Sequence, residues 1–99
     1  MAMSYLKDKR YLKVRDKALK RDKFLCQRCK RYGKKKTATV THHIYPVEFF
    51  PYWVFCLWNL ISLCKACHDR MHNRETHELT AEGVALQRKV IPPGVEHRF

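Results

Sequence analysis

The chain has 99 residues, which is too short for two hydrophobic cores, so we expect a single domain over residues 1–99. It carries 21 Lys and Arg against 9 Asp and Glu, which gives a formal net charge of +12. The excess is confined to the first 36 residues, which hold 15 of the basic and 3 of the acidic side chains. A positive field of this asymmetry attracts polyanions, most commonly nucleic acid. The alternative is a solvated helix face that only keeps the protein soluble.

Export and membrane insertion are both disfavoured. The first 22 residues are charged throughout and lack the apolar segment of a secretory signal. The most apolar stretch, 44–63, is interrupted by two prolines, a glutamate and an asparagine, so it does not read as a membrane span. We therefore expect a cytoplasmic protein with no membrane partner, in which five cysteines indicate metal binding sooner than a disulfide framework.

The N-terminal part of the chain predicts a basic amphipathic helix followed by a strand. Over residues 9–22, apolar side chains recur at helical spacing and Lys and Arg occupy the remaining face. The apolar face comprises Tyr11, Leu12, Val14, Ala18 and Leu19. After a cationic loop over 31–36, the β-branched residues of 37–44 predict a strand that Pro46 should end.

The C-terminal part predicts a second strand and two helices. A short strand is expected over 60–63, after an irregular aromatic segment over 47–57. Its aromatic part, Phe49 to Trp53, is expected to pack under a metal site or at a homodimer contact, and the alternative is that it stacks on a base or wedges into a groove. Residues 65–74 lack Gly and Pro and predict a helix, and another over 79–90 should stop at Pro92-Pro93-Gly94.

Two Cys-x2-Cys pairs separated by 34 residues are the most specific feature of the sequence. They consist of Cys26, Cys29, Cys64 and Cys67. Four thiolates at this spacing suit a tetrahedral zinc ion, and such a closed shell is structural because it leaves no position for water. The alternatives are a pair of disulfides or four incidental buried thiols. Cys56 stands outside the pattern and is expected to be a small buried apolar residue.

The histidines form a second pattern, His-His-x15-Asn-x8-His-x3-His, made by His42, His43, Asn59, His68 and His72. His68 and His72 are four positions apart on a predicted helix, so both can approach one ion. Neighbours on a strand point to opposite faces, so His42 and His43 reach one site only at a strand end or a β-bulge. Alternatively, one imidazole binds the ion while the other acts as a base.

Less specific roles for these residues stay open. His42, His68 and His72 could hold a second, purely structural zinc. His43 could be an ordinary strand histidine, and Asn59 a helix cap or turn residue. We expect His77 and His97 to face solvent without a function.

At these motifs the chain resembles the HNH endonucleases of the ββα-metal fold, in particular the small four-cysteine proteins of bacteria and phages. The resemblance covers residues 22–73 and rests on Arg-Asp-x3-Cys-x2-Cys, Val-Thr-His-His-Ile-x-Pro and Asn-Leu-Ile-Ser-Leu-Cys-x2-Cys-His-x3-His. It implies an α+β fold, a β-hairpin packed on a helix and stabilised by zinc. Residues 1–21 would then be a basic helical extension and residues 79–99 a C-terminal extension.

The resemblance also implies a role for each histidine. His43 would be the general base that deprotonates the attacking water, and Asn59 would hold the hairpin loop. His68 and His42 would bind the catalytic divalent cation, with His72 as a further ligand or phosphate contact. The cation would be Mg²⁺, Mn²⁺, Ni²⁺ or Zn²⁺, and imidazole ligands in place of carboxylate disfavour Mg²⁺.

The implied function is metal-dependent hydrolysis of DNA phosphodiester bonds, in a bacterial or phage-infected cell. Basic side chains around the first cysteine pair are the expected phosphate contacts: Arg28, Lys30, Arg31, Lys34, Lys35 and Lys36. One alternative is a non-catalytic zinc module that binds nucleic acid. Another is a module associated with a phage DNA-packaging terminase, which could also accompany nuclease activity.

Overall fold

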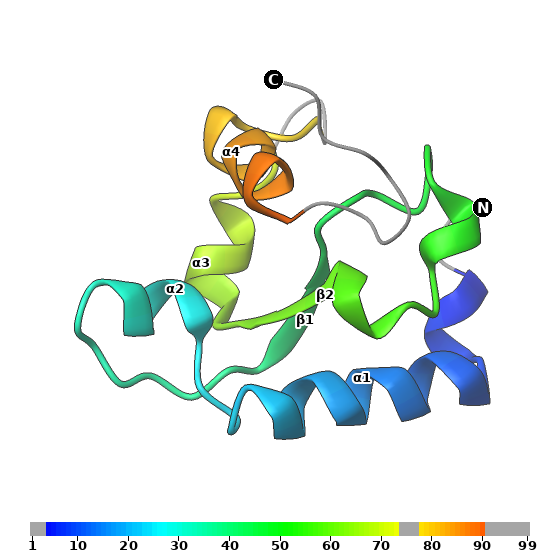
Figure 1. The fold of residues 1–99 in the computed structure, drawn as a ribbon, viewed down its shortest axis with the longest axis horizontal. Helices are drawn as coiled ribbons and strands as arrows, with labels where there is room; N and C mark the ends of the chain where they lie inside the picture. Colours follow the sequence, from blue (N-terminus) through cyan, green and yellow to red (C-terminus); the bar gives the residue numbers. More distant parts are fainter. Residues whose placement is uncertain (1–3, 74–77, 91–99) are drawn as a thin grey trace.

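The computed structural model describes residues 4–73 and 78–90. Its centre is an antiparallel hairpin of β1 (Val40–His43) and β2 (Leu60–Leu63), in which Val40 pairs with Leu63 and His43 with Leu60. Helix α1 (Lys9–Arg21) runs along one side of the hairpin, and α3 (Lys65–Asp69) follows β2 directly (Figure 1). The predicted α+β architecture, a two-stranded hairpin with a basic N-terminal helix, is confirmed.

Helix α1 forms where its apolar periodicity predicts. Asp8 caps its N-terminus, because the carboxylate accepts a hydrogen bond of 2.8 Å from the backbone N–H of Arg10. Its buried residues are Tyr11, Val14, Ala18 and Leu19. Tyr11, Val14 and Ala18 form one core cluster with Leu60 of β2. Leu12 was expected on this face, but it is 47% exposed because it lies outside the buried stripe.

The C-terminal end of α1 is tied to the hairpin by two charged residues. The Arg21 guanidinium donates to the backbone carbonyls of Leu57 and Leu60, at 3.0 and 2.5 Å. The Asp22 carboxylate accepts from Arg21 at 2.9 Å and from the backbone N–H of Ser62 at 3.0 Å. Burial opposes ionisation of Asp22, but the hydrogen bonds from Arg21 and Ser62 prevail and lower its pKa.

The first strand is shorter than expected from the β-branched run. Thr37 forms an isolated bridge with Leu25 instead of pairing with β2, and the backbone N–H of Ala38 donates to Phe24 at 2.9 Å. Because β2 is only four residues long, Thr37 and Ala38 pair instead with Leu25 and Phe24, which directly precede the first cysteine pair. Of that pair, Cys26 caps α2 (Gln27–Arg31) and Cys29 lies on it.

Helix α3 is also shorter than expected and ends at Asp69 instead of continuing to residue 74. The carbonyls of Arg70 and Met71 accept hydrogen bonds from the hydroxyl and the backbone N–H of Thr80, at 2.6 and 2.9 Å. The backbone N–H of Asn73, which would donate to the Asp69 carbonyl in a continued helix, donates instead to the Glu78 carbonyl at 2.7 Å. Thr80 also caps α4 (Ala81–Lys89), as its hydroxyl accepts from Gly83. Arg74, His77, the stop at 92–94 and His97 lie outside the described residues.

The aromatic segment between the strands packs on itself and on Tyr45, which contacts the end of α4. It contains the 3-10 helices η2 (Pro51–Trp53) and η3 (Leu57–Asn59), and a third, η1 (Ser4–Lys7), precedes α1. The rings of Phe50 and Trp53 stack with centroids 5.1 Å apart. The Tyr45 hydroxyl donates to carbonyls at the end of α4, at 2.9 and 2.8 Å.

The described part of the chain has no helix long and apolar enough to cross a membrane.

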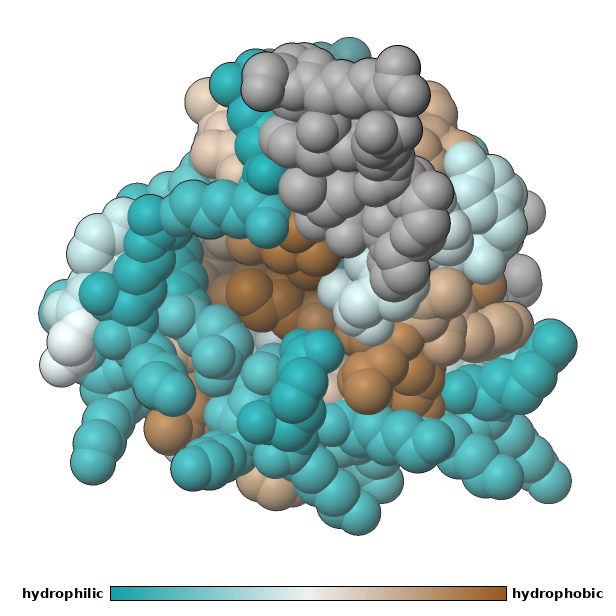
Figure 2. All heavy atoms as spheres, in the orientation of Figure 1, coloured by the Kyte–Doolittle hydropathy of each residue, from teal (hydrophilic) through white to brown (hydrophobic). Residues whose placement is uncertain are grey.

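A groove lies between α2, β2 and α4. Figure 2 shows hydrophobic atoms in a hollow on this face, bordered by hydrophilic side chains. Apolar side chains of Ile61, Leu63, Met71 and Leu86 contribute to its lining. Basic and acidic side chains of α2 and α4 complete its lining, together with Gln27, Tyr32 and Ala85.

Candidate functional site

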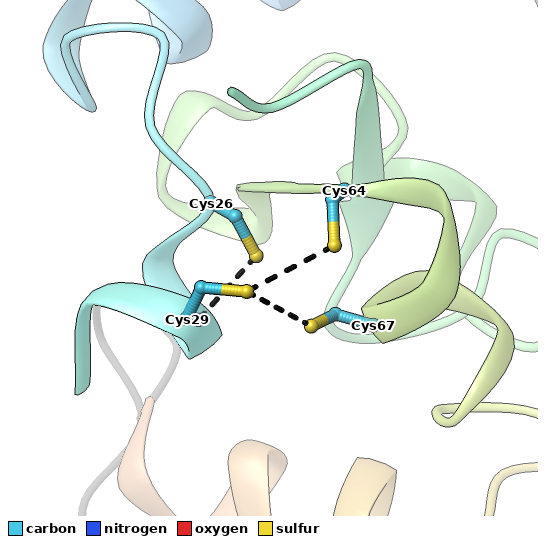
Figure 3. Close-up of side chains that lie close together, drawn as sticks. All are labelled: Cys26, Cys29, Cys64 and Cys67. Atoms are coloured by element: carbon cyan, nitrogen blue, oxygen red, sulfur yellow. Dashed lines mark hydrogen bonds between the residues drawn. The ribbon is translucent and has the colours of Figure 1, made fainter. Parts of the chain in front are cut away.

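The four paired cysteines converge on one point (Figure 3). Cys29 Sγ lies 4.0 Å from Cys64 Sγ and 3.6 Å from Cys67 Sγ. Sulfurs bound to zinc at 2.3 Å in a tetrahedron are about 3.8 Å apart, whereas a disulfide bond measures about 2.05 Å. The four cysteines are free thiols at separations that fit a tetrahedral metal ion. Cys56 lies outside this cluster and is half-buried instead of buried.

Arg28 connects this cluster to α4. Its guanidinium donates to both carboxylate oxygens of Glu82, at 2.5 and 3.0 Å, and to Cys67 Sγ at 3.7 Å. Burial and then the neighbouring Cys64 raise the pKa of the Cys67 thiol to about 12, and the Arg28 guanidinium opposes this shift by stabilising the thiolate, which is the form that binds a metal. The Arg28 guanidinium also lies 5.1 Å from the centre of the Tyr32 ring, so it is held by three protein groups. The other basic residues named as phosphate contacts are exposed: Lys30, Arg31, Lys34, Lys35 and Lys36.

Three of the predicted histidines also come together. The donor atoms of His42, His68 and His72 all lie within 4.8 Å of one another. The His42 ring lies 5.3 Å from that of His68 and 5.1 Å from that of His72, measured between centroids. His68 is on α3, but His72 follows the end of this helix, where it forms a bridge with Leu79. The tertiary fold, and not a shared helix face, therefore places His72 beside His68.

The chemistry of this cluster suits a cation. His42 is 1% exposed, and its Nε2 has no hydrogen-bond partner among the described residues. An unpaired buried nitrogen is costly unless a ligand satisfies it. Burial, followed by the proximity of His68 and His72, holds the pKa of His42 well below its usual value, and burial likewise lowers the pKa of His68. Both rings are therefore neutral near pH 7, as metal binding requires.

His43 points away from this cluster, as expected for the neighbour of His42 on a strand. It is the last residue of β1, and its Nε2 lies 3.0 Å from the backbone carbonyl of Val54. Because a carbonyl only accepts, the neutral His43 ring carries its proton on Nε2 and its lone pair on Nδ1. Burial lowers its pKa despite the opposing effect of Val54, so this lone pair is available near pH 7.

Asn59 closes the segment that carries Val54. It is fully buried, and its side chain accepts from the backbone N–H of Tyr45 at 2.8 Å. It also donates to the carbonyls of Tyr45 and Trp53, at 3.1 and 3.3 Å. These three bonds hold Tyr45, just before the aromatic segment, and Trp53, next to Val54, close to the end of β1, so Asn59 is more than a turn residue.

Sequence reasoning missed three contacts around these residues. Tyr11 was assigned only to the apolar face of α1, yet its ring stacks on His43. Neither the Val54 carbonyl nor the Arg28–Glu82 ion pair was foreseen. A backbone carbonyl and a pair 54 residues apart leave no local pattern, so no signal in the sequence could have identified them.

No family model matches the chain, and no curated protein matches it. Among solved structures, the chain is similar to the HNH endonuclease of the deep-sea thermophilic bacteriophage GVE2, crystallised with a manganese ion. The two are 32% identical, and the match covers 70% of this chain and 75% of the phage protein with a TM-score of 0.67. This likeness confirms the resemblance drawn from the cysteine and histidine motifs and the ββα-metal architecture. The chain belongs to the HNH endonuclease family.

Proposed function

We propose that this protein is a metal-dependent endonuclease that hydrolyses DNA phosphodiester bonds and carries a structural zinc ion on its four paired cysteines. The observation that carries the proposal is the buried His42 with an unpaired Nε2, beside His68 and His72. The similar phage protein is an HNH endonuclease crystallised with a manganese ion, which supports a divalent cation here.

His42, His68 and His72 would hold the divalent cation. When bound, it would supply positive charge to the scissile phosphate as negative charge develops there. The ligand set consists of neutral imidazoles, a softer environment than carboxylates, so we expect Mn²⁺, Ni²⁺ or Zn²⁺ to support more activity than Mg²⁺.

His43 would act as the general base. The Val54 carbonyl keeps the proton on Nε2, which leaves Nδ1 to accept a proton from the attacking water. The water oxygen then bonds to phosphorus as the bond to the 3′ oxygen breaks, and the departing 3′ oxygen takes up a proton from solvent. The expected products are a 5′-phosphate and a 3′-hydroxyl.

Asn59 and the basic residues would serve this step indirectly. Asn59 holds Val54, and thereby the His43 ring, in place through its hydrogen bonds to Tyr45 and to Trp53, the residue before Val54. The exposed lysines of the first cysteine pair and the loop after it would contact phosphates, which gives affinity without sequence preference.

Conversion of supercoiled plasmid to nicked and linear forms tests the proposal. The purified protein is compared with His43→Ala and His42→Ala in Mg²⁺, Mn²⁺, Ni²⁺ and Zn²⁺. We expect metal-dependent cleavage by the wild type, loss of turnover in His43→Ala with unchanged DNA affinity, and weaker metal binding in His42→Ala.

Two results would contradict the proposal. Equal cleavage by the wild type and His43→Ala would exclude His43 as the base. A salt-sensitive gel shift without cleavage in any of the four metals would favour a non-catalytic nucleic-acid-binding module.

A further inference from the structure

The N-terminal extension contacts His43 although it lies outside the motifs shared with the family. The ring of Tyr11, on α1, stacks on the His43 imidazole with centroids 5.7 Å apart and an interplanar angle of 26°. Tyr5, on η1, meets the same imidazole edge-on at 5.2 Å and 86°. The base proposed above is therefore enclosed by two aromatic rings from a part of the chain that carries none of the motif histidines.

Both tyrosines are themselves held in place. Tyr11 is 5% exposed, and its hydroxyl is hydrogen-bonded to Thr41 Oγ1 at 3.0 Å. Thr41 precedes His43 by two positions on β1, so their side chains share one face of the strand. Tyr5 packs edge-on against Tyr11 at 4.9 Å, and its carbonyl accepts from the backbone N–H of Asp8, the cap of α1. Tyr11 is thus anchored to the strand that it covers.

The hydrogen bond to Val54 restrains only one atom of the imidazole. A ring held at Nε2 alone can still tilt about that contact, and Nδ1 would then swing away from its target. Tyr11, stacked on one face of the imidazole, and Tyr5, packed edge-on against it, prevent this tilt. General-base catalysis is sensitive to such displacement because the proton must move along a short hydrogen bond.

We propose that Tyr11, braced by Tyr5, is a positioning residue that holds the His43 imidazole in the orientation in which Nδ1 serves as the base. This inference rests on the proposed role of His43. Tyr11 makes no contact with the reacting atoms in this scheme and acts only through the orientation of His43.

Steady-state cleavage of a fluorescent DNA duplex by the full-length, zinc-loaded protein tests the inference. In Tyr11→Leu we expect kcat to fall about 10- to 100-fold with KM little changed, since misplacement of a catalytic group by about 1 Å can cost 100-fold. Tyr11→Phe keeps the ring and should stay within a few-fold of the wild type.

Val14→Ala is the matched control. Val14 lies on the same helix and in the same core cluster as Tyr11, and its side chain has no ring to stack on His43. It should lower thermal stability while kcat stays unchanged, with all assays run well below the unfolding temperature of each variant. A fall in kcat in Val14→Ala equal to that in Tyr11→Leu would overturn the inference.

Long-range ¹H–¹⁵N spectra of the imidazole rings give a readout that does not depend on cleavage. The wild type should show His43 as a single tautomer protonated at Nε2, and Tyr11→Leu should show averaged or broadened signals at the same pH. An unchanged spectrum in Tyr11→Leu would overturn the inference while leaving the proposed function intact. Absence of cleavage by the wild type would instead refute the proposed function, and the inference with it.

Discussion

The side chain of Asn59 pairs with both backbone polar groups of Tyr45, 14 positions earlier in the chain. The amide oxygen accepts from the Tyr45 N–H and the amide nitrogen donates to the Tyr45 carbonyl, at 2.8 and 3.1 Å. Asn59 therefore acts as a backbone pair would, and it extends the hairpin by one rung beyond β1 and β2. This rung supports the aromatic segment from which Val54 reaches His43.

Asn59→Asp should remove this rung with little change in volume. A carboxylate cannot donate to the carbonyls of Tyr45 and Trp53, and it would be buried without a compensating charge. We expect the free energy of unfolding to fall by about 2–4 kcal/mol. Urea unfolding of the zinc-loaded protein measures the change, with the exposed Lys30→Ala as a control that should match the wild type. Retained stability in Asn59→Asp would contradict the bridging role of the amide.

Cys64→Ser should release the structural ion. Loss of one thiolate opens the four-sulfur shell, and the folding free energy that metal binding contributes is lost with it. We expect bound zinc, measured by elemental analysis, to fall from about one ion per chain to well below one, with a lower unfolding temperature. Cys56→Ser, outside the cluster, should retain its zinc. Equal zinc content in the two variants would contradict the assignment of Cys64.

Asp22→Asn should lower stability in a pH-dependent manner. The folded-state pKa of Asp22 lies below the ordinary value of 3.8, so its stabilising effect is fully present above that pH and is lost as the pH falls through the folded-state pKa. We expect a loss of about 1–2 kcal/mol at pH 6 that shrinks toward zero at lower pH. Chemical unfolding of both proteins at a series of pH values measures the difference, and a difference independent of pH would contradict this account.

Lys35→Ala should weaken DNA binding through charge alone. Loss of one phosphate contact is expected to reduce the slope of log K against log salt by about 1 and to affect all sequences equally. Arg28→Ala should behave differently and speed zinc release to a chelator, because Arg28 contacts Cys67 and Glu82. Fluorescence anisotropy at several salt concentrations and chelator kinetics distinguish the two. An unchanged salt slope in Lys35→Ala would remove that lysine from the interface.

Local patterns in the sequence were sufficient for several elements and for the grouping of the site residues. The apolar spacing from Tyr11 to Leu19 predicted α1, and the bounds of β2 agree with the prediction. Cysteine spacing predicted one four-sulfur cluster, which the fold assembles. These features succeed because helical periodicity and ligand spacing depend on residues close together in the chain.

Features that depend on competition between distant groups were decided only by the tertiary structure. Nothing near Asp69 in the sequence predicts the end of α3; after it, the backbone N–H of Asn73 donates to Glu78 and His72 forms a bridge with Leu79, so the chain pairs with the segment that leads to α4. That early end moves His72 off the helix, yet packing still brings it to His42. The stacking of Tyr11 on His43 likewise depends on how α1 docks against β1. Sequence spacing specifies which residues can share an element, but hydrogen bonds and ring contacts between elements decide where each element ends and what surrounds the site.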